Sequence, residues 1–206
     1  RFTHCPKRSH EEAVKQICRY LKGTKEKGII FEPTGDYTLD CYVDADFAGL
    51  WKCEDPQDPV SVRSRTGYTL TFGGCPLLWV SKLQTEIALS TTEAEYIALS
   101  QSMRDLLPTK QVIIEVLTSL GIHLERATTH STVFEDNNGA LSLAHTLGMT
   151  PRTKHIGVKY HFFREHVRRG TVKVQKIESE NQKADIFTKG LGRVKFESIR
   201  LKLMGW

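Results

Sequence analysis

The segment Ser90–Leu99 constrains the fold most, because it places acidic residues at the start of an otherwise apolar helix. Ser90 is a good N-cap, and Glu93 three residues later completes a capping box in which its carboxylate returns to the backbone N–H of Ser90. Glu95 has no such task. It shares a helical face with Ala98, whose small side chain lets that face approach a sheet closely. Since a carboxylate on a close-packed face is costly unless positive charge meets it, we expect a cation near Glu95.

Length and composition are those of an ordinary globular protein. The 206 residues, with 39% hydrophobic and 26% charged, suffice for one domain with a core plus an appendage. No apolar run is long enough to span a bilayer and there is no signal peptide, so no membrane partner is expected. The net charge of +5 is a mild bias toward polyanions. Five cysteines without a C-x-x-C pair argue against a disulfide framework or a zinc knuckle.

Hydrophobic periodicity predicts strands and helices in an order typical of a mixed α/β sheet. Strands are expected at 28–31, 37–46, 65–72, from 77 onward, 131–136 and 171–177, and helices at 10–21, 91–106, 111–120, 137–144, 154–169 and 181–190. Pro108 is expected to interrupt the helix that begins at Thr91. The short turns between the three strands from 37 to 80 predict an antiparallel meander. The strand followed at once by a helix at 131–144 implies a crossover and mixed strand directions.

Four acids stand where this sheet meets a helix: Asp44 near a strand end, Glu95 in a helix, Asp136 at a strand-to-helix junction and Asp185 early in the last helix. Clustered carboxylates repel one another, so their pKa values should rise in the absence of a metal. Mg²⁺ prefers such oxygen ligands, and two ions about 3.5–4 Å apart can activate water and stabilise a leaving oxygen. Each acid also has an ordinary explanation, since Asp136 can cap the next helix and Asp185 can favour a helix N-terminus.

Several separate segments share a pattern that decides between these explanations. They are Tyr42–Gly49 (YVDADFAG), Ser64–Tyr68 (SRTGY), Ser81–Gln84 (SKLQ), Leu89–Leu99, Glu135–Ala140 (EDNNGA), Lys154–Ile156 with Tyr160–Glu165 (YHFFRE), and Ala184–Lys189 (ADIFTK). In order and spacing they resemble the ribonuclease H domain that ends the polyprotein of copia-type LTR retrotransposons. The likeness covers about residues 39–191. Residues 15–24 resemble the segment that connects reverse transcriptase to this domain.

The resemblance implies a ribonuclease H-like α/β fold, with a five-stranded mixed sheet in the order 3-2-1-4-5 flanked by helices. It implies a connection segment at 1–36, the ribonuclease H domain at 37–191 and a C-terminal tail at 192–206. The implied activity is endonucleolytic cleavage of the RNA strand of RNA–DNA hybrids, giving 5′-phosphate products with two Mg²⁺ ions, or Mn²⁺ in their place. The implied partners are the hybrid and the reverse transcriptase domain of the same polyprotein, in the cytoplasm within a virus-like particle, or in the nucleus.

Residue by residue, Asp44, Asp136 and Asp185 match the first, third and fourth acids of the family. Glu95, with an alanine three positions later, matches the second acid better than Glu93 does. The resemblance therefore assigns catalysis and metal binding to Asp44, Glu95, Asp136 and Asp185. The chain departs from many relatives in one respect, because residues 174–183 contain no histidine where those relatives carry one thought to assist product release.

A hybrid is expected to be recognised by shape, phosphates and 2′-hydroxyl groups rather than by base edges. Phosphate contacts need cationic side chains, polar side chains and backbone donors near helix starts. The candidate nucleic-acid-binding residues are Arg65, Asn137, Asn138, Lys154, His155 and Asn181.

Two other functions compete with this interpretation. A degenerate retroelement copy could keep the fold and bind hybrid without cleaving it, although the four acids are intact. A DNA-processing nuclease or transposase of the same broad fold usually orders its acids Asp, Asp, Glu, whereas here the glutamate comes second. Cleavage of a hybrid, compared with cleavage of duplex DNA, would separate these functions.

Overall fold

A computed structural model describes residues 5–49, 60–122, 131–146, 156 and 160–206. The chain divides into two compact units, residues 1–30 and 31–206. In the first unit, helix α1 (Arg8–Gly23) is amphipathic, and its apolar residues Val14, Ile17 and Leu21 are exposed. The predicted strand at 28–31 is wrong, because this segment forms no ladder with any described strand.

The second unit is built on a sheet ordered β3-β2-β1-β4-β5, which confirms the predicted order. The strands are β1 (Leu39–Asp46), β2 (Arg65–Phe72), β3 (Cys75–Leu83), β4 (Ser131–Glu135) and β5 (Val172–Lys176). The first three strands form an antiparallel meander, β4 runs parallel to β1, and β5 runs parallel to β4. The chain therefore has the mixed α/β architecture of the ribonuclease H-like fold.

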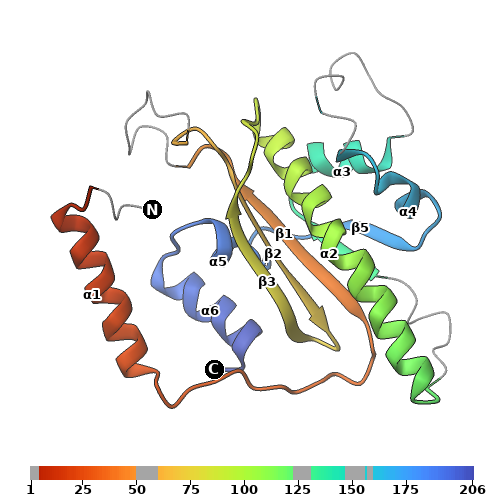
Figure 1. Ribbon diagram of the computed structural model, residues 1–206, viewed down its shortest axis with the longest axis horizontal. Helices are drawn as coiled ribbons and strands as arrows, with labels where there is room; N and C mark the ends of the chain where they lie inside the picture. Colours follow the sequence, from red (N-terminus) through yellow and green to blue (C-terminus); the bar gives the residue numbers. More distant parts are fainter. Residues whose placement is uncertain (1–4, 50–59, 123–130, 147–155, 157–159) are drawn as a thin grey trace. The chain divides into compact units, whose positions relative to one another are not determined.

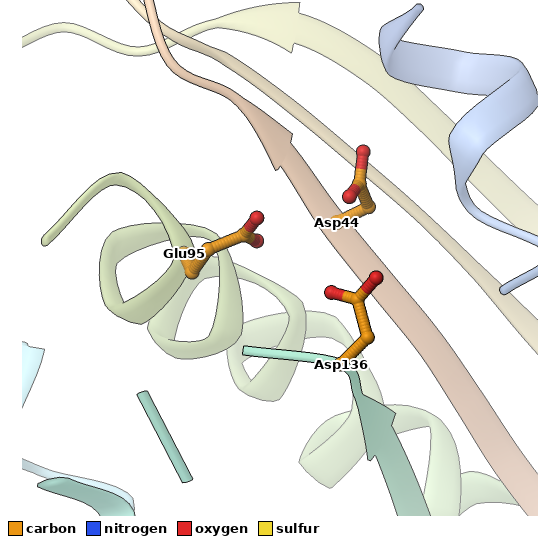
Figure 2. Close-up of side chains that lie close together, drawn as sticks. All are labelled: Asp44, Glu95 and Asp136. Carbon is orange, nitrogen blue, oxygen red and sulfur yellow. The ribbon is translucent and has the colours of Figure 1, made fainter. Parts of the chain in front are cut away.

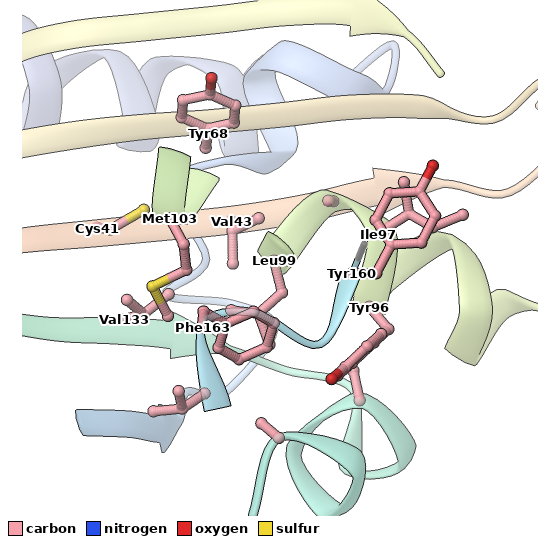
Figure 3. Close-up of a cluster of buried hydrophobic side chains, with 14 of the residues drawn as sticks. Cys41, Val43, Tyr68, Tyr96, Ile97, Leu99, Met103, Val133, Tyr160 and Phe163 are labelled. Atoms are coloured by element: carbon pink, nitrogen blue, oxygen red, sulfur yellow. The ribbon is translucent and has the colours of Figure 1, made fainter. Parts of the chain in front are cut away.

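Helices lie on both sides of this sheet (Figure 1). They are α2 (Thr91–Ser119), α3 (Asn138–His145), α4 (Arg164–Arg168), α5 (Asp185–Thr188) and α6 (Arg193–Met204). The core forms where α2 covers β1 and β2, and it contains Leu99 and Met103 together with Cys41, Val43 and Val133 (Figure 3). Alternation along β1 sends these residues to the core and leaves Asp44 on the other face.

Helix α2 runs through Pro108 without interruption, so the predicted break is wrong. Proline lacks the N–H that would bond to the carbonyl of Arg104, but both residues are exposed. Burial of one face, which includes Met103 and Leu106, holds the helix together at this point.

The C-terminal half of the second unit differs from the prediction in three places. Within the described residues, the helix expected at 154–169 is reduced to α4, and the helix expected at 181–190 to the single turn of α5. Residues 192–206, expected to be a tail, contain α6, which contacts β3 and buries Ile199 and Leu203. Phe196, Ile199 and Leu203 have the spacing of one helical face, a signal that the sequence analysis did not use. No described helix has the length and apolar character needed to cross a bilayer.

We expect Pro108→Ala to stabilise the protein. The helix penalty of proline is about 3 kcal/mol, and the extra freedom of the unfolded alanine chain removes about 1, so the free energy of unfolding should rise by about 2 kcal/mol. Urea unfolding followed by circular dichroism measures this change. Val112→Ala, an exposed substitution in the same helix, should shift stability by less than about 1 kcal/mol. An unchanged midpoint for Pro108→Ala would show that the proline costs the helix nothing.

Candidate metal centre

Asp44 lies near the end of β1 with its side chain fully buried. Its partner across the antiparallel ladder in β2 is Gly67. A Cβ at Gly67 would lie 2.6 Å from Cγ2 of Thr188 and 2.8 Å from Cβ of Phe187. Only glycine fits there, because α5 closes against β2 at this point. The glycine therefore lets α5 reach the carboxylate of Asp44.

The start of α2 positions Glu95. The hydroxyl of Ser90 accepts the N–H of Glu93 at 3.1 Å, which confirms the predicted N-cap. The carboxylate of Glu93 accepts the N–H of Leu89 at 2.8 Å. The expectation that it returns to the N–H of Ser90 is wrong, because it reaches one residue further back. The side chain of Glu93 is thus engaged in capping, whereas that of Glu95 projects elsewhere.

Asp136 follows β4 directly and is half-buried. Its Oδ2 accepts the hydroxyl of Ser179 at 2.7 Å. It does not cap α3, because Asn137 does so by accepting the N–H of Ala140 at 3.0 Å. A Cβ at Gly139 would lie 2.5 Å from Oγ1 of Thr92. The glycine therefore lets the start of α3 approach the start of α2, which brings Asp136 toward Glu95.

Three of the four predicted acids converge. One carboxylate oxygen from each of Asp44, Glu95 and Asp136 lies within 4.8 Å of the other two. Figure 2 shows the side chains pointing toward one another from β1, from α2 and from the end of β4. Glu95 is only 7% exposed, and its Oε2 has no hydrogen-bond partner among the described residues.

The electrostatics of this cluster disfavour three ionised carboxylates. Burial, followed by the charges of Glu135, Asp44 and Asp136, raises the pKa of Glu95 to about 11. Burial also raises the pKa of Asp44, although Lys189 opposes the rise. The cluster therefore lacks positive charge on the side of Glu95.

Glu135 is a further acid beside the cluster that the sequence marked only as a strand end. It is fully buried, and burial raises its pKa to about 8. Its Oε1 accepts the N–H of Asn137 at 3.0 Å, while its Oε2 has no hydrogen-bond partner in the part of the chain that the structure describes. The alternation of β4 places Glu135 on the buried face, so its position was available from the sequence.

These residues fit a divalent cation. Around an octahedral Mg²⁺ ion, neighbouring oxygens are about 3 Å apart and opposite ones about 4.2 Å apart. The three carboxylate oxygens, which lie within 4.8 Å of one another, can therefore surround one ion once their side chains close around it. All three donors are carboxylate oxygens, the ligand type that Mg²⁺ and Mn²⁺ prefer. The unpartnered Oε2 of Glu95 is the atom that such an ion would satisfy.

Asp185, the fourth predicted acid, lies outside this trio. It begins α5, is 2% exposed, and accepts hydrogen bonds from Lys189 at 2.9 Å and from Lys195. The same ammonium of Lys189 donates to Oδ1 of Asp44 at 2.9 Å, and the hydroxyl of Thr188 donates to Oδ2. Burial lowers the pKa of Lys189, but the two carboxylates outweigh it and raise that pKa above its ordinary value.

Gln182 is a buried positioning residue that the sequence analysis missed. Its Nε2 donates to the carbonyls of Val43 at 2.8 Å and Phe134 at 3.3 Å, where β1 and β4 separate. Its Oε1 accepts the N–H of Ala184 at 3.2 Å. These bonds hold the segment that leads into Asp185. A single glutamine in a polar stretch carries no signal that would reveal this role.

The predicted nucleic-acid-binding residues have varied environments. Arg65 is half-buried at the start of β2 and donates to Ser81 at 3.3 Å. The side-chain carbonyl of Asn137 caps α3 by accepting the N–H of Ala140, whereas Asn138 is exposed. Asn181 is exposed and accepts the ammonium of Lys202 at 2.9 Å. Lys154 and His155 lie outside the described residues. Their role in binding stays a prediction.

The sheet order and the carboxylate cluster define the class as a ribonuclease H-like α/β domain. Proteins of retrotransposons are the close relatives of this chain. It is 40% identical over 197 residues to the retrovirus-related Pol polyprotein from transposon TNT 1-94 of Nicotiana tabacum. The matched region is 96% of this chain and 14% of that polyprotein. The chain is 36% identical over 202 residues to the retrovirus-related Pol polyprotein from transposon RE1 of Arabidopsis thaliana, and this match covers 98% of the chain and 13% of the relative.

The chain is thus homologous to a segment of retrovirus-related Pol polyproteins, and it spans about one seventh of their length. A shorter match, 40% identical over 101 residues, is to the secreted RxLR effector protein 161 of Plasmopara viticola. It covers 49% of this chain and 64% of that protein. No protein-family model matches the chain.

In the absence of divalent metal, stability should fall as the pH rises from about 5 to about 8. The pKa of Glu135 is raised from 4.5 to about 8 on folding. Between these values the unfolded state ionises and the folded state does not, so the stability present at low pH is lost as the pH passes 8. Glu135→Gln should reduce the slope of this dependence without abolishing it, because the raised pKa of Glu95 acts in the same direction. Urea unfolding in EDTA measures the slope. The exposed Glu180→Gln should leave it unchanged. Equal slopes for Glu135→Gln and the parent would contradict the assignment.

Proposed function

We propose that residues 31–206 form a metal-dependent ribonuclease H that cuts the RNA strand of RNA–DNA hybrids during reverse transcription of a retrotransposon. One observation carries the proposal: Asp44, Glu95 and Asp136 bring carboxylate oxygens within 4.8 Å of one another in a ribonuclease H-like fold. The homologous Pol polyproteins support the retrotransposon context and a reverse transcriptase domain as partner in the same polyprotein.

The chain's own residues perform three tasks in this reaction. Asp44, Glu95 and Asp136 would hold a divalent cation, which when bound would lower the pKa of water and neutralise charge on the scissile phosphate. Burial of Asp44 and Glu95 excludes water from the ligands and keeps them in place. The hydroxyl of Ser179 donates to Oδ2 of Asp136 and so helps to orient this carboxylate.

The hybrid itself meets the cluster at the exposed side of Asp136. Asn138 is exposed at the first turn of α3, where backbone N–H groups lack helical partners. Such a helix start, next to Asp136, suits a backbone phosphate. A second ion, which the resemblance implies, would need Asp185, whose two oxygens are engaged by Lys189 and Lys195.

Asp136→Asn should lower the rate of hybrid cleavage by about 100-fold or more, since it removes a metal ligand and about 2.7 kcal/mol of transition-state stabilisation. The assay uses an end-labelled RNA–DNA hybrid with Mg²⁺, beside single-stranded RNA, duplex RNA and duplex DNA. We expect cleavage of the hybrid's RNA strand alone. Binding without Mg²⁺-dependent cleavage by the parent would favour the inactive binding module, and cleavage of duplex DNA would favour a DNA nuclease.

Two glutamates on the first turns of α2 provide a matched pair. Glu95→Gln should reduce cleavage as strongly as Asp136→Asn, because it removes a ligand. Glu93→Gln should retain cleavage within a few-fold, since its side chain caps the N–H of Leu89 and an amide oxygen can still accept that bond. Thermal melting of both variants controls for folding. The reverse ranking of the two variants would move the catalytic role to Glu93.

A further inference from the structure

The ammonium of Lys189 lies where a second divalent cation would have to bind. It donates to Oδ1 of Asp44 and to Oδ1 of Asp185, at 2.9 Å in each case. These carboxylates are 0% and 3% exposed, and Lys189 is the cation that both of them contact within the described residues. An ion shared by Asp44 and Asp185 would need the same oxygens.

We propose that Lys189 takes the place of the second metal ion, so that this site binds one divalent cation, held by Asp44, Glu95 and Asp136. The inference rests on the proposed function and specifies its metal content. Asp44 is the shared member, since it faces both the carboxylate trio and the ammonium. The oxygens of Asp185 then serve to hold Lys189 rather than to bind metal.

The surroundings of Lys189 hold it in this position. It directly follows α5, whose N-terminal residue is Asp185, so the lysine and the aspartate are four residues apart and lie on one side of that turn. Ser81 donates to the carbonyl of Phe187 at 2.5 Å, which ties α5 to β3. The absence of a side chain at Gly67 lets α5 lie close to β2.

The charges also balance with one divalent cation. Lys195 donates to the other oxygen of Asp185, so two ammonium groups face this site. Together with one divalent cation they match the charge of the four carboxylates of Asp44, Glu95, Asp136 and Asp185, with Glu135 buried beside them. A second divalent cation bound by Asp44 and Asp185 would lie next to an ammonium about 3 Å from its ligands and would be repelled by it.

Counting bound Mn²⁺ on the purified 206-residue chain tests the proposal. Loss of the free-Mn²⁺ electron paramagnetic resonance signal gives the number bound, and the spectrum of the bound ions shows whether two are coupled. We expect one uncoupled ion per chain in the parent. Lys189→Met should bind two coupled ions, because it uncovers Asp44 and Asp185 for a second ion about 3.5–4 Å from the first.

Matched variants make the result specific. Lys195→Met removes an ammonium that contacts Asp185 but not Asp44, so it should still bind one ion. Adding Asp185→Asn to Lys189→Met should return the count from two to one. Asp185→Asn alone should change the Mn²⁺ affinity by less than about threefold, since the proposal gives it no metal contact in the parent.

Several outcomes would overturn the proposal. Two coupled ions in the parent, or one ion in a folded Lys189→Met variant, contradicts the role of Lys189 and leaves the proposed nuclease function standing. If circular dichroism shows that Lys189→Met does not fold, Asp185→Asn decides, and a tenfold or greater loss of Mn²⁺ affinity contradicts the proposal. No bound Mn²⁺ in the parent contradicts the metal centre itself, and with it the proposed function.

Discussion

Burial of like charges at the end of β1 is the constraint on which the site depends. Asp44, Glu95 and Glu135 are each less than a tenth exposed. Burying neighbouring carboxylates costs free energy that the same groups, apart and in water, would not cost. The fold meets this cost unevenly. Two lysines and a threonine hydroxyl satisfy Asp44 and Asp185, whereas one oxygen of Glu95 and one of Glu135 have no partner. The unsatisfied side is where a cation stabilises the folded chain most.

The acidic side chains of this site belong to two different polar networks, one with its cation present in the chain and one without. The bridge from Asp44 through Lys189 to Asp185 is complete within the chain, so it contributes to folding whether or not metal is present. The trio of Asp44, Glu95 and Asp136 lacks a cation at its centre, and its carboxylates repel one another. A bound metal ion would relieve this repulsion. Stability and metal affinity are therefore coupled through Asp44, the residue that belongs to both networks.

Much of the fold was predictable because its strands have strong patterns. The strand expected at 37–46 contains β1, and the bounds of β2 were predicted to the residue. Elements that depend on tertiary contact were missed. Helix α6 was not expected, although Phe196, Ile199 and Leu203 have helical spacing, and α2 passes through Pro108 because its other face is buried. Packing against the rest of the chain stabilises both.

The acids were located individually from the sequence, but the cations that meet them were not. Lys189 stands in a segment that marked the family resemblance, yet its spacing from Asp185 gives no sign that it also reaches Asp44, 145 residues earlier. That contact depends on Gly67, which opposes Asp44 in the ladder and leaves room for the residues just before Lys189. A single turn such as α5 is too short to be stable by itself, so close contact with β2 and β3 must fix it. The sheet therefore determines the position of the Lys189 ammonium, because Gly67 in β2 leaves room for α5 to bring this ammonium to Asp44.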